Sequence, residues 1–133
     1  MGKRIPKQST IAGLIAFFAT CSVADAQGAN RTVAVGGVLK VGHYASVNPD
    51  CSPLGMPVVR LSVPPTHGVV RTIQTSGFSH FSGPFAQCDA RRVAGVSVEY
   101  RPERGFAGAD SFSLDIIYAS GRERVESFTI MIK

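Results

Sequence analysis

The sequence contains no tryptophan, only three cysteines among its 133 residues, and few charged residues (17%). Hydrophobic residues make up 44% of the chain, a composition that excludes an intrinsically disordered tail. No apolar run reaches the roughly 20 residues that a stable membrane-spanning helix requires, so no transmembrane anchor is expected. Turn-forming residues are abundant, with 14 glycines and 8 prolines. In a chain of this length they are typical of a single all-β domain.

The N-terminal segment has the organisation of an export signal. Basic residues precede an apolar run at residues 11–19, and Ala24-Asp25-Ala26 has the small-x-small pattern that signal peptidase accepts. We predict a signal peptide at residues 1–26 and a mature domain at residues 27–133, secreted or periplasmic. The alternative is a lipoprotein acylated at Cys21, although Phe-Ala-Thr precedes this cysteine where such sites carry Leu-x-Gly or Leu-x-Ala.

Removal of the leader leaves a mildly basic domain. The leader holds three of the 14 Lys and Arg and one of the nine Asp and Glu, so eleven cations face eight anions, a net charge of +3. Nine of the eleven cations are arginines, which suit bidentate contacts with carboxylates and phosphates. The expected partner is a protein or an anionic cell-envelope polymer, and export excludes intracellular nucleic acid. The alternative is a solvated surface of mixed charge, and the oligomeric state stays open.

The cysteine count predicts one disulfide. Cys21 leaves with the leader, and Cys51 and Cys88 remain as an even pair in an oxidising compartment. The chain-entropy estimate for a closed loop of roughly 38 residues is a stabilisation of about 4 kcal/mol. The alternative is a pair of free thiols or metal ligands.

Apolar residues recur at every second position along most of the mature chain, the period of a strand with one buried face. Gly36-Gly37 separates the first two such segments, and residues 119–122 read as a hairpin between the last two. The fold class predicted from this pattern is an all-β, antiparallel sandwich of about seven strands. The predicted strands lie at residues 32–35, 38–44, 59–63, 68–74, 96–101, 111–118 and 127–132.

Three segments carry a family resemblance. They are Pro-Thr-His-Gly-Val-Val at residues 65–70, Tyr-Arg-Pro at residues 100–102, and Gly-Phe-Ala-Gly-Ala-Asp-Ser-Phe at residues 105–112. Residues 65–133 thereby resemble the bacterial immunoglobulin-like and cadherin-like repeat domains of secreted and surface proteins, which implies an immunoglobulin-like sandwich. The chain departs from the family in holding a single copy and in lacking the acidic cluster of calcium-bridged repeats. No calcium or other cofactor is therefore expected.

The three segments also have a physical interpretation. Gly105 and Gly108 permit backbone angles closed to other residues. Phe106 between them is placed to plug the sandwich. Asp110 stands where its carboxylate can accept local backbone N–H groups.

Residues capable of catalysis or metal binding are present without a recognisable spacing. The three histidines, His43, His67 and His80, sit far apart in sequence, so a copper site that would include Met56 is the weaker alternative. No Gly-x-Ser-x-Gly elbow occurs, although a Ser-His-Asp triad that assembles in space stays open. We predict no enzyme, no catalytic residue and no metal. The carboxylates that could form a hydrolytic pair are Glu99, Glu103, Asp110 and Asp115.

A Gly/Ser loop at residues 75–88 is the candidate binding site, because it concentrates aromatic residues. The alternative is that these rings fold back to cap one end of the sandwich, fastened by Cys88. The function predicted is an exported, non-enzymatic immunoglobulin-like binding module. The alternatives are a structural subunit that pairs through a sheet edge, or a small metal or redox protein. The candidate binding residues are Phe78, His80, Phe81 and Phe85, with Arg91 and Arg92 beside them.

Overall fold

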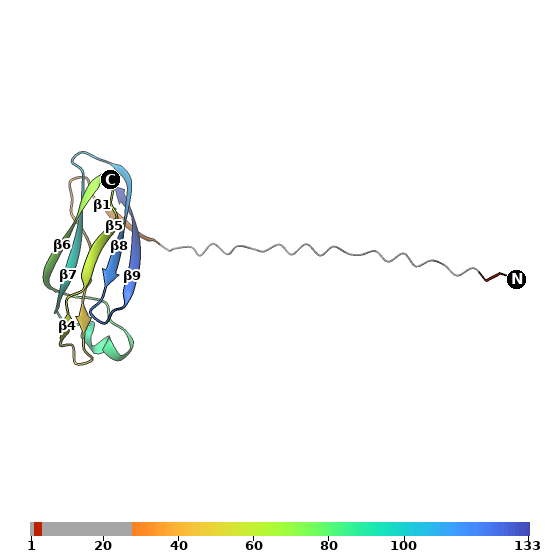
Figure 1. Cartoon of the computed structure of the whole chain (residues 1–133). Helices are drawn as coiled ribbons and strands as arrows, with labels where there is room; N and C mark the ends of the chain where they lie inside the picture. Colours follow the sequence, from red (N-terminus) through yellow and green to blue (C-terminus); the bar gives the residue numbers. More distant parts are fainter. Residues whose placement is uncertain (1, 4–27) are drawn as a thin grey trace.

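The computed structural model describes residues 2–3 and 28–133 (Figure 1). The predicted cleavage site, Cys21 and nearly all of the predicted signal peptide lie outside the described residues. The described chain is all-β apart from one short 3-10 helix, η1. Its elements are β1 (Ala29–Val33), β2 (Leu39–Tyr44), β3 (Ser46–Val47), β4 (Pro53–Gly55), β5 (Val58–Val63), β6 (Gly68–Gly77), η1 (Gly83–Cys88), β7 (Val93–Pro102), β8 (Gly108–Ile117) and β9 (Glu123–Ile132).

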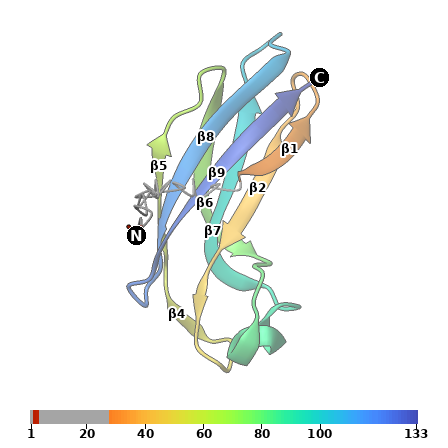
Figure 2. The same cartoon turned by 90° about the vertical axis from the view of Figure 1, so that its right-hand side faces the viewer.

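The strands form two facing sheets and one short hairpin (Figures 1 and 2). One sheet has the order β1-β9-β8-β5, the other β2-β7-β6, and β3 pairs with β4. The all-β sandwich is therefore confirmed, but the expectation of purely antiparallel pairing is wrong at one place, because β1 runs parallel to β9. Gly36, with φ at 75°, allows the turn that carries the chain from one sheet to the other, so β1 and β2 do not pair with each other.

The main core follows from the alternation of side chains along three long strands. The apolar residues of β7, β8 and β9 that the sequence places on one face are buried between the sheets. The hairpin at residues 119–122 is confirmed, whereas η1 and the β3–β4 pair were not predicted from the sequence. The most buried side chains of this core are Val98, Tyr100, Phe112, Leu114, Ile116, Ile130 and Ile132.

One end of the sandwich is organised around the buried carboxylate of Asp110, which is 6% exposed. Its oxygens accept the N–H groups of Thr66 at 2.9 Å, His67 at 3.0 Å and Ser111 at 2.9 Å, and the hydroxyl of Tyr100 at 2.7 Å. The three segments that carry the family resemblance therefore meet at this carboxylate. Asp110 accepts backbone N–H groups as expected, but two of them come from a distant loop.

The neighbouring residues of these segments pack closely around the same carboxylate. The ring of Phe106 stacks on His67 with ring centres 4.0 Å apart. A Cβ at Gly68 would lie 2.4 Å from the ring of Tyr100, so only glycine lets the tyrosine reach Asp110. This end of the sandwich is thus a structural unit held by hydrogen bonds and stacking.

A second, smaller core lies at the other end of β7 and contains the disulfide. Cys51 and Cys88 are bonded, as predicted, and Cys88 is fully buried. The side-chain amide of Gln87 donates to the carbonyl of Pro49, which joins η1 to the turn that carries Cys51. This core fixes the loop after β6 against the turn after β3. Its buried members are Ala45, Val47, Cys88 and Val93, with Phe81 and Phe85 half-buried against them.

Candidate functional site: a cleft at the disulfide end

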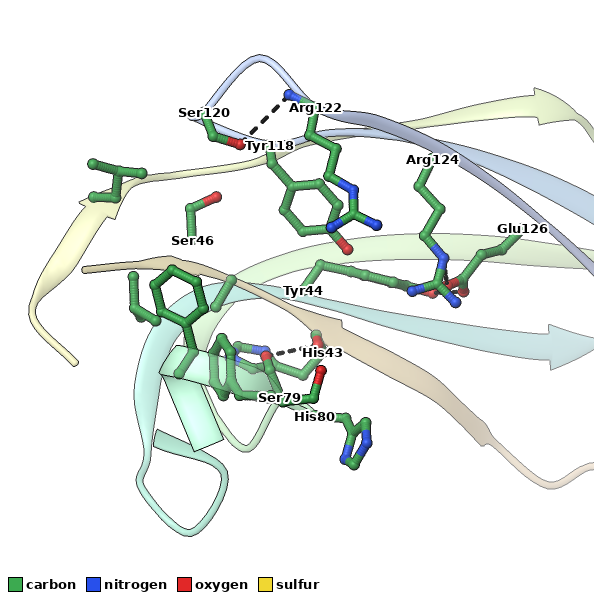
Figure 3. A pocket seen from close by; sticks show the side chains of 16 residues that line it. His43, Tyr44, Ser46, Ser79, His80, Tyr118, Ser120, Arg122, Arg124 and Glu126 are labelled. Carbon is green, nitrogen blue, oxygen red and sulfur yellow. Dashed lines mark hydrogen bonds and ion pairs between the residues drawn. The ribbon is translucent and has the colours of Figure 1, made fainter. Parts of the chain in front are cut away.

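A cleft of about 520 Å³ opens beside the second core (Figure 3). Its walls are the end of β2 with β3, the hairpin between β8 and β9, and the loop at residues 79–85. Tyr118 and Glu126 continue the inward-facing positions of β8 and β9, because they alternate in step with buried Ile116 and Phe128. The cleft is therefore the open continuation of the space between the two sheets.

A hydrogen-bonded chain of side chains forms one wall of the cleft. The hydroxyl of Tyr44 donates to Oε2 of Glu126 at 2.6 Å, and Nε of Arg124 lies 2.9 Å from Oε1 of the same carboxylate. Tyr44 is at the end of β2 and Glu126 is in β9, so this chain links the two sheets. Both oxygens of Glu126 are thereby occupied, and its charge is matched by Arg124.

Arg122 and Tyr118 continue this wall toward the β8–β9 hairpin, where Arg122 is exposed. Their side chains point into the same space as Tyr44 (Figure 3). The hairpin that carries them is held to β3, because the backbone N–H of Ala119 donates to Oγ of Ser46 at 3.1 Å. The cleft thus presents an aromatic surface beside a guanidinium group, an arrangement that suits an anionic ligand with an apolar or planar part.

All three tyrosines of the protein are expected to resist ionisation in the folded state. Burial, with the Glu126 carboxylate, raises the pKa of Tyr44; burial, with Asp110, raises the pKa of Tyr100; burial raises the pKa of Tyr118. A tyrosine whose pKa is raised in the folded state makes its full contribution to the free energy of unfolding below the ordinary tyrosine pKa of about 10. That contribution is lost as the pH rises through the pKa of the folded state.

The difference in tyrosine ionisation between the folded and the unfolded protein is measurable by ultraviolet absorbance, since the protein has no tryptophan. We expect the folded protein to show less tyrosinate absorbance than the urea-unfolded protein at a pH where the unfolded protein is half ionised. Tyrosinate from Tyr44 and Tyr100 should appear only together with unfolding, monitored by circular dichroism. Titration of one tyrosine near pH 10 in a protein that stays folded would contradict the burial of that hydroxyl.

His43 supports the floor of the cleft without being free to act as a ligand. Its Nε2 donates to the carbonyl of Val93 at 3.0 Å, which leaves Nδ1 to accept from the Ser97 hydroxyl at 3.1 Å. The hydroxyl of Ser79 donates to the His43 carbonyl at 2.8 Å and anchors the start of the loop. His43 is therefore a structural residue that ties β2, β7 and the loop together.

The structure divides the predicted binding residues into two places. His80, Phe81 and Phe85 line the cleft. The two phenylalanines fold back against Cys88. His80 is almost fully exposed, and its Nδ1 lies 3.1 Å from Oδ1 of Asp89.

The other three predicted residues lie outside the cleft. Phe78 is 58% exposed, and the guanidinium carbon of Arg92 lies 5.7 Å from the centre of its ring. Arg92 also donates to the carbonyl of Ser76 at 3.1 Å, and Arg91 is exposed. The aromatic loop is thus neither a continuous exposed patch nor wholly part of the core.

The residues weighed for catalysis lie in separate places, although Oε2 of Glu103 lies 3.5 Å from Nδ1 of His67. Asp110 points into the sandwich, whereas Asp115 and Glu99 lie on the outer faces of different sheets. His67 stacks on Phe106, at the end of β7 opposite to His43. Among the described residues, no group of three or more His, Cys, Asp or Glu side chains is placed to hold a metal ion.

Sequence reasoning missed most of the residues that shape the cleft. Three of them, Arg122, Arg124 and Glu126, belong to a short, strongly charged segment that was interpreted only as the end of a hairpin and the chain before the last predicted strand. The density of charge at residues 122–126 was the available signal. The missed residues are Tyr44, Tyr118, Arg122, Arg124 and Glu126.

Comparisons with known proteins identify no family for this chain. A scan against protein-family models and a search of curated proteins found no match to this chain. Within residues 2–3 and 28–133, no helix is long and apolar enough to cross a membrane.

Proposed function

We propose that the protein is an exported, non-enzymatic binding domain of the immunoglobulin-like class, and that it holds an anionic part of a protein or cell-envelope polymer in the cleft. The observation that carries this proposal is the pairing of an open cleft with Arg122, whose guanidinium faces the cleft beside Tyr118 and Tyr44. The bonded cysteines are compatible with an oxidising, extracytoplasmic compartment.

The strand order supports the immunoglobulin-like assignment. In a constant-type immunoglobulin domain, strands A to G in chain order form one sheet of A, B, E and D and another of C, F and G. If β2 is strand B and β5 to β9 are strands C to G, the two sheets here are B-E-D and C-F-G. The first strand, β1, then lies beside G in place of the usual position of A beside B.

The charges of the cleft support an anionic ligand. Arg124 is matched by Glu126, whose second oxygen accepts the Tyr44 hydroxyl. The remaining cation in this part of the cleft, Arg122, is on the exposed hairpin, where a ligand reaches it without displacing a buried group. A carboxylate or phosphate would form a bidentate contact with this guanidinium.

Reversing the charge of Arg122 is expected to abolish most of the binding. We expect Arg122→Glu to weaken co-sedimentation of the exported, oxidised protein with its own cell-envelope fraction by about tenfold or more, since a carboxylate would repel an anionic ligand. Arg91→Glu is the matched control, because Arg91 is exposed and lies outside the cleft, and the net charge changes equally.

Three results distinguish the possible sites. Loss of binding in Arg122→Glu but not in Arg91→Glu supports the cleft. Equal losses would indicate a non-specific effect of net charge, and a loss in Phe78→Ser alone would move the site to the Phe78–Arg92 contact. Both of these outcomes contradict the proposal, and circular dichroism and a urea midpoint establish that each variant is folded.

A further inference from the structure

Within residues 2–3 and 28–133, only half of the outer edge of β9 is covered by another strand. β1 pairs with the C-terminal half of β9, from Ala29 beside Phe128 to Val33 beside Ile132 (Figure 2). Among the described residues, no strand pairs with the same edge at residues 123–127. A sheet edge of this kind presents free backbone donors and acceptors to an added strand.

The hydrogen bonds of Lys133 show which backbone groups face this edge. Its N–H donates to the carbonyl of Val33 at 3.1 Å, and its carbonyl accepts the N–H of Val35 at 3.3 Å. Because successive residues of a strand direct their N–H and C=O groups to alternate sides, Val125 and Glu123 direct theirs to the same edge as Lys133. The side chain of Val125 is on the outer face of the sheet and is 64% exposed.

This edge, to which no strand of the described part of the chain is paired, borders the cleft. Arg124 and Glu126 flank Val125 on β9. Their side chains point inward and line the cleft. A strand added here would continue the line of β1 and would direct every second side chain into the cleft. Strand β1 already has side chains at the equivalent inward positions. Val33 is buried in the main core, and Ala29 packs against that core.

We infer that an extended segment of a partner protein binds as an added strand along residues 123–127 of β9, with an acidic side chain directed into the cleft toward Arg122. This inference rests on the proposed function and specifies its ligand. A polypeptide is favoured over a polysaccharide because only a polypeptide repeats N–H and C=O groups at the spacing of a β-strand edge. The acidic side chain is favoured by the charge of Arg122, because Arg124 is already matched by Glu126.

The test removes one backbone donor from the edge. Val125→Pro deletes the N–H group that faces the free edge and leaves the bonds between β8 and β9 intact, because proline is tolerated on an edge whose N–H faces solvent. The probe is a fluorescein-labelled synthetic peptide, Thr-Val-Glu-Val-Thr-Val, and fluorescence anisotropy reports binding to the exported, oxidised protein. We expect Val125→Pro to weaken binding by about tenfold or more.

Thr72→Pro in β6 is the matched control. The N–H of Glu103 donates to the carbonyl of His67 at 2.8 Å, so odd-numbered residues of β6 face β7 and Thr72 faces outward. The contact of Arg92 with the outward carbonyl of Ser76 agrees with this alternation. Thr72→Pro therefore removes an edge donor far from the cleft, and binding is expected to stay unchanged.

A second probe keeps the test independent of protein folding. The same peptide, N-methylated at alternate residues, retains its side chains but cannot pair with a sheet edge, and we expect it to lose binding to the wild-type protein.

Each contrary result has a distinct meaning. If Arg122→Glu weakens envelope binding while the two peptides behave alike or fail to bind, the added strand is refuted and the proposed function stands. If Arg122→Glu leaves envelope binding unchanged, both fail. A polyuronate that binds in place of the peptide, or a wild-type dimer in sedimentation that Val125→Pro dissociates, would assign the edge to another occupant and overturn the inference.

Discussion

Replacement of Asp110 by alanine is expected to lower the free energy of unfolding by about 3–5 kcal/mol. The change removes the acceptor of three backbone N–H groups and of the Tyr100 hydroxyl. Each buried donor left without a partner costs about 1–3 kcal/mol, and entry of water recovers part of the sum. Because small domains are stable by only about 5–15 kcal/mol, urea denaturation should show a large shift in midpoint.

The same carboxylate should make stability depend on acid pH. Burial on its own raises the pKa of Asp110, but the hydrogen bonds from Tyr100, Thr66, Ser111 and His67 outweigh it and hold that pKa below its ordinary value. The contribution of Asp110 is then complete above the unfolded pKa of about 3.9 and is lost as the pH falls through the lower, folded value. Asp110→Asn should flatten this part of the profile of stability against pH.

A second aspartate on the same strand is the control. Asp115 pairs with Arg60 at 2.7 Å on the outer face of the sheet, where the side chain of Arg60 is 60% exposed and that of Asp115 is 13% exposed. Its carboxylate contacts one exposed arginine in place of the four donors that meet at Asp110, so Asp115→Asn should lower the urea midpoint less than Asp110→Asn does. Equal destabilisation by Asp110→Asn and Asp115→Asn would show that Asp110 is not the organising group of its end of the sandwich.

The strands were predictable because their signal is local. Alternation of apolar residues places Val98, Phe112 and Ile130 on inward faces, and all three are buried. The partner of β1 was not predictable, because β1 and β9 are almost 100 residues apart and nothing in either segment encodes parallel pairing. The disulfide was predictable for a different reason, since the two cysteines of the predicted mature domain allow only one pairing.

The cleft was harder to predict because its walls come from distant parts of the chain. Tyr44 and Glu126 are 82 residues apart in sequence, and neither stands out in its own segment. The aromatic loop was conspicuous, but composition does not tell which rings turn inward. Phe81 and Phe85 pack on Cys88, whereas Phe78, at the end of β6, remains exposed.

The two ends of the sandwich therefore have different characters. At one end, a buried carboxylate satisfies the polar groups of the segments around it. At the other end, the disulfide joins a loop to a turn within the second core. The space between the two sheets stays open there and forms the cleft. In the proposed function, this open end presents backbone and side-chain groups to the ligand.

Removal of the disulfide is the second change with a large expected effect. The bond joins residues separated by 37 positions, for which the loss of chain entropy in the unfolded state amounts to about 4 kcal/mol. The double variant Cys51→Ala with Cys88→Ala should therefore lose about 3–5 kcal/mol of unfolding free energy, because truncation at the fully buried Cys88 also loosens the second core. Urea denaturation of the variant and of oxidised and reduced wild type measures this loss.

The loss should also be localised, which separates it from a general weakening of the fold. The main core and the Asp110 end contain no cysteine, so their amides should remain the slowest to exchange with deuterium below the unfolding transition. Amides of residues 78–92 should exchange faster, and the binding that we propose for the cleft should fall because Phe81 and Phe85 form part of its wall. Uniform acceleration across β8 and β9 would show instead that the two cores unfold as one unit and that the disulfide stabilises the whole sandwich.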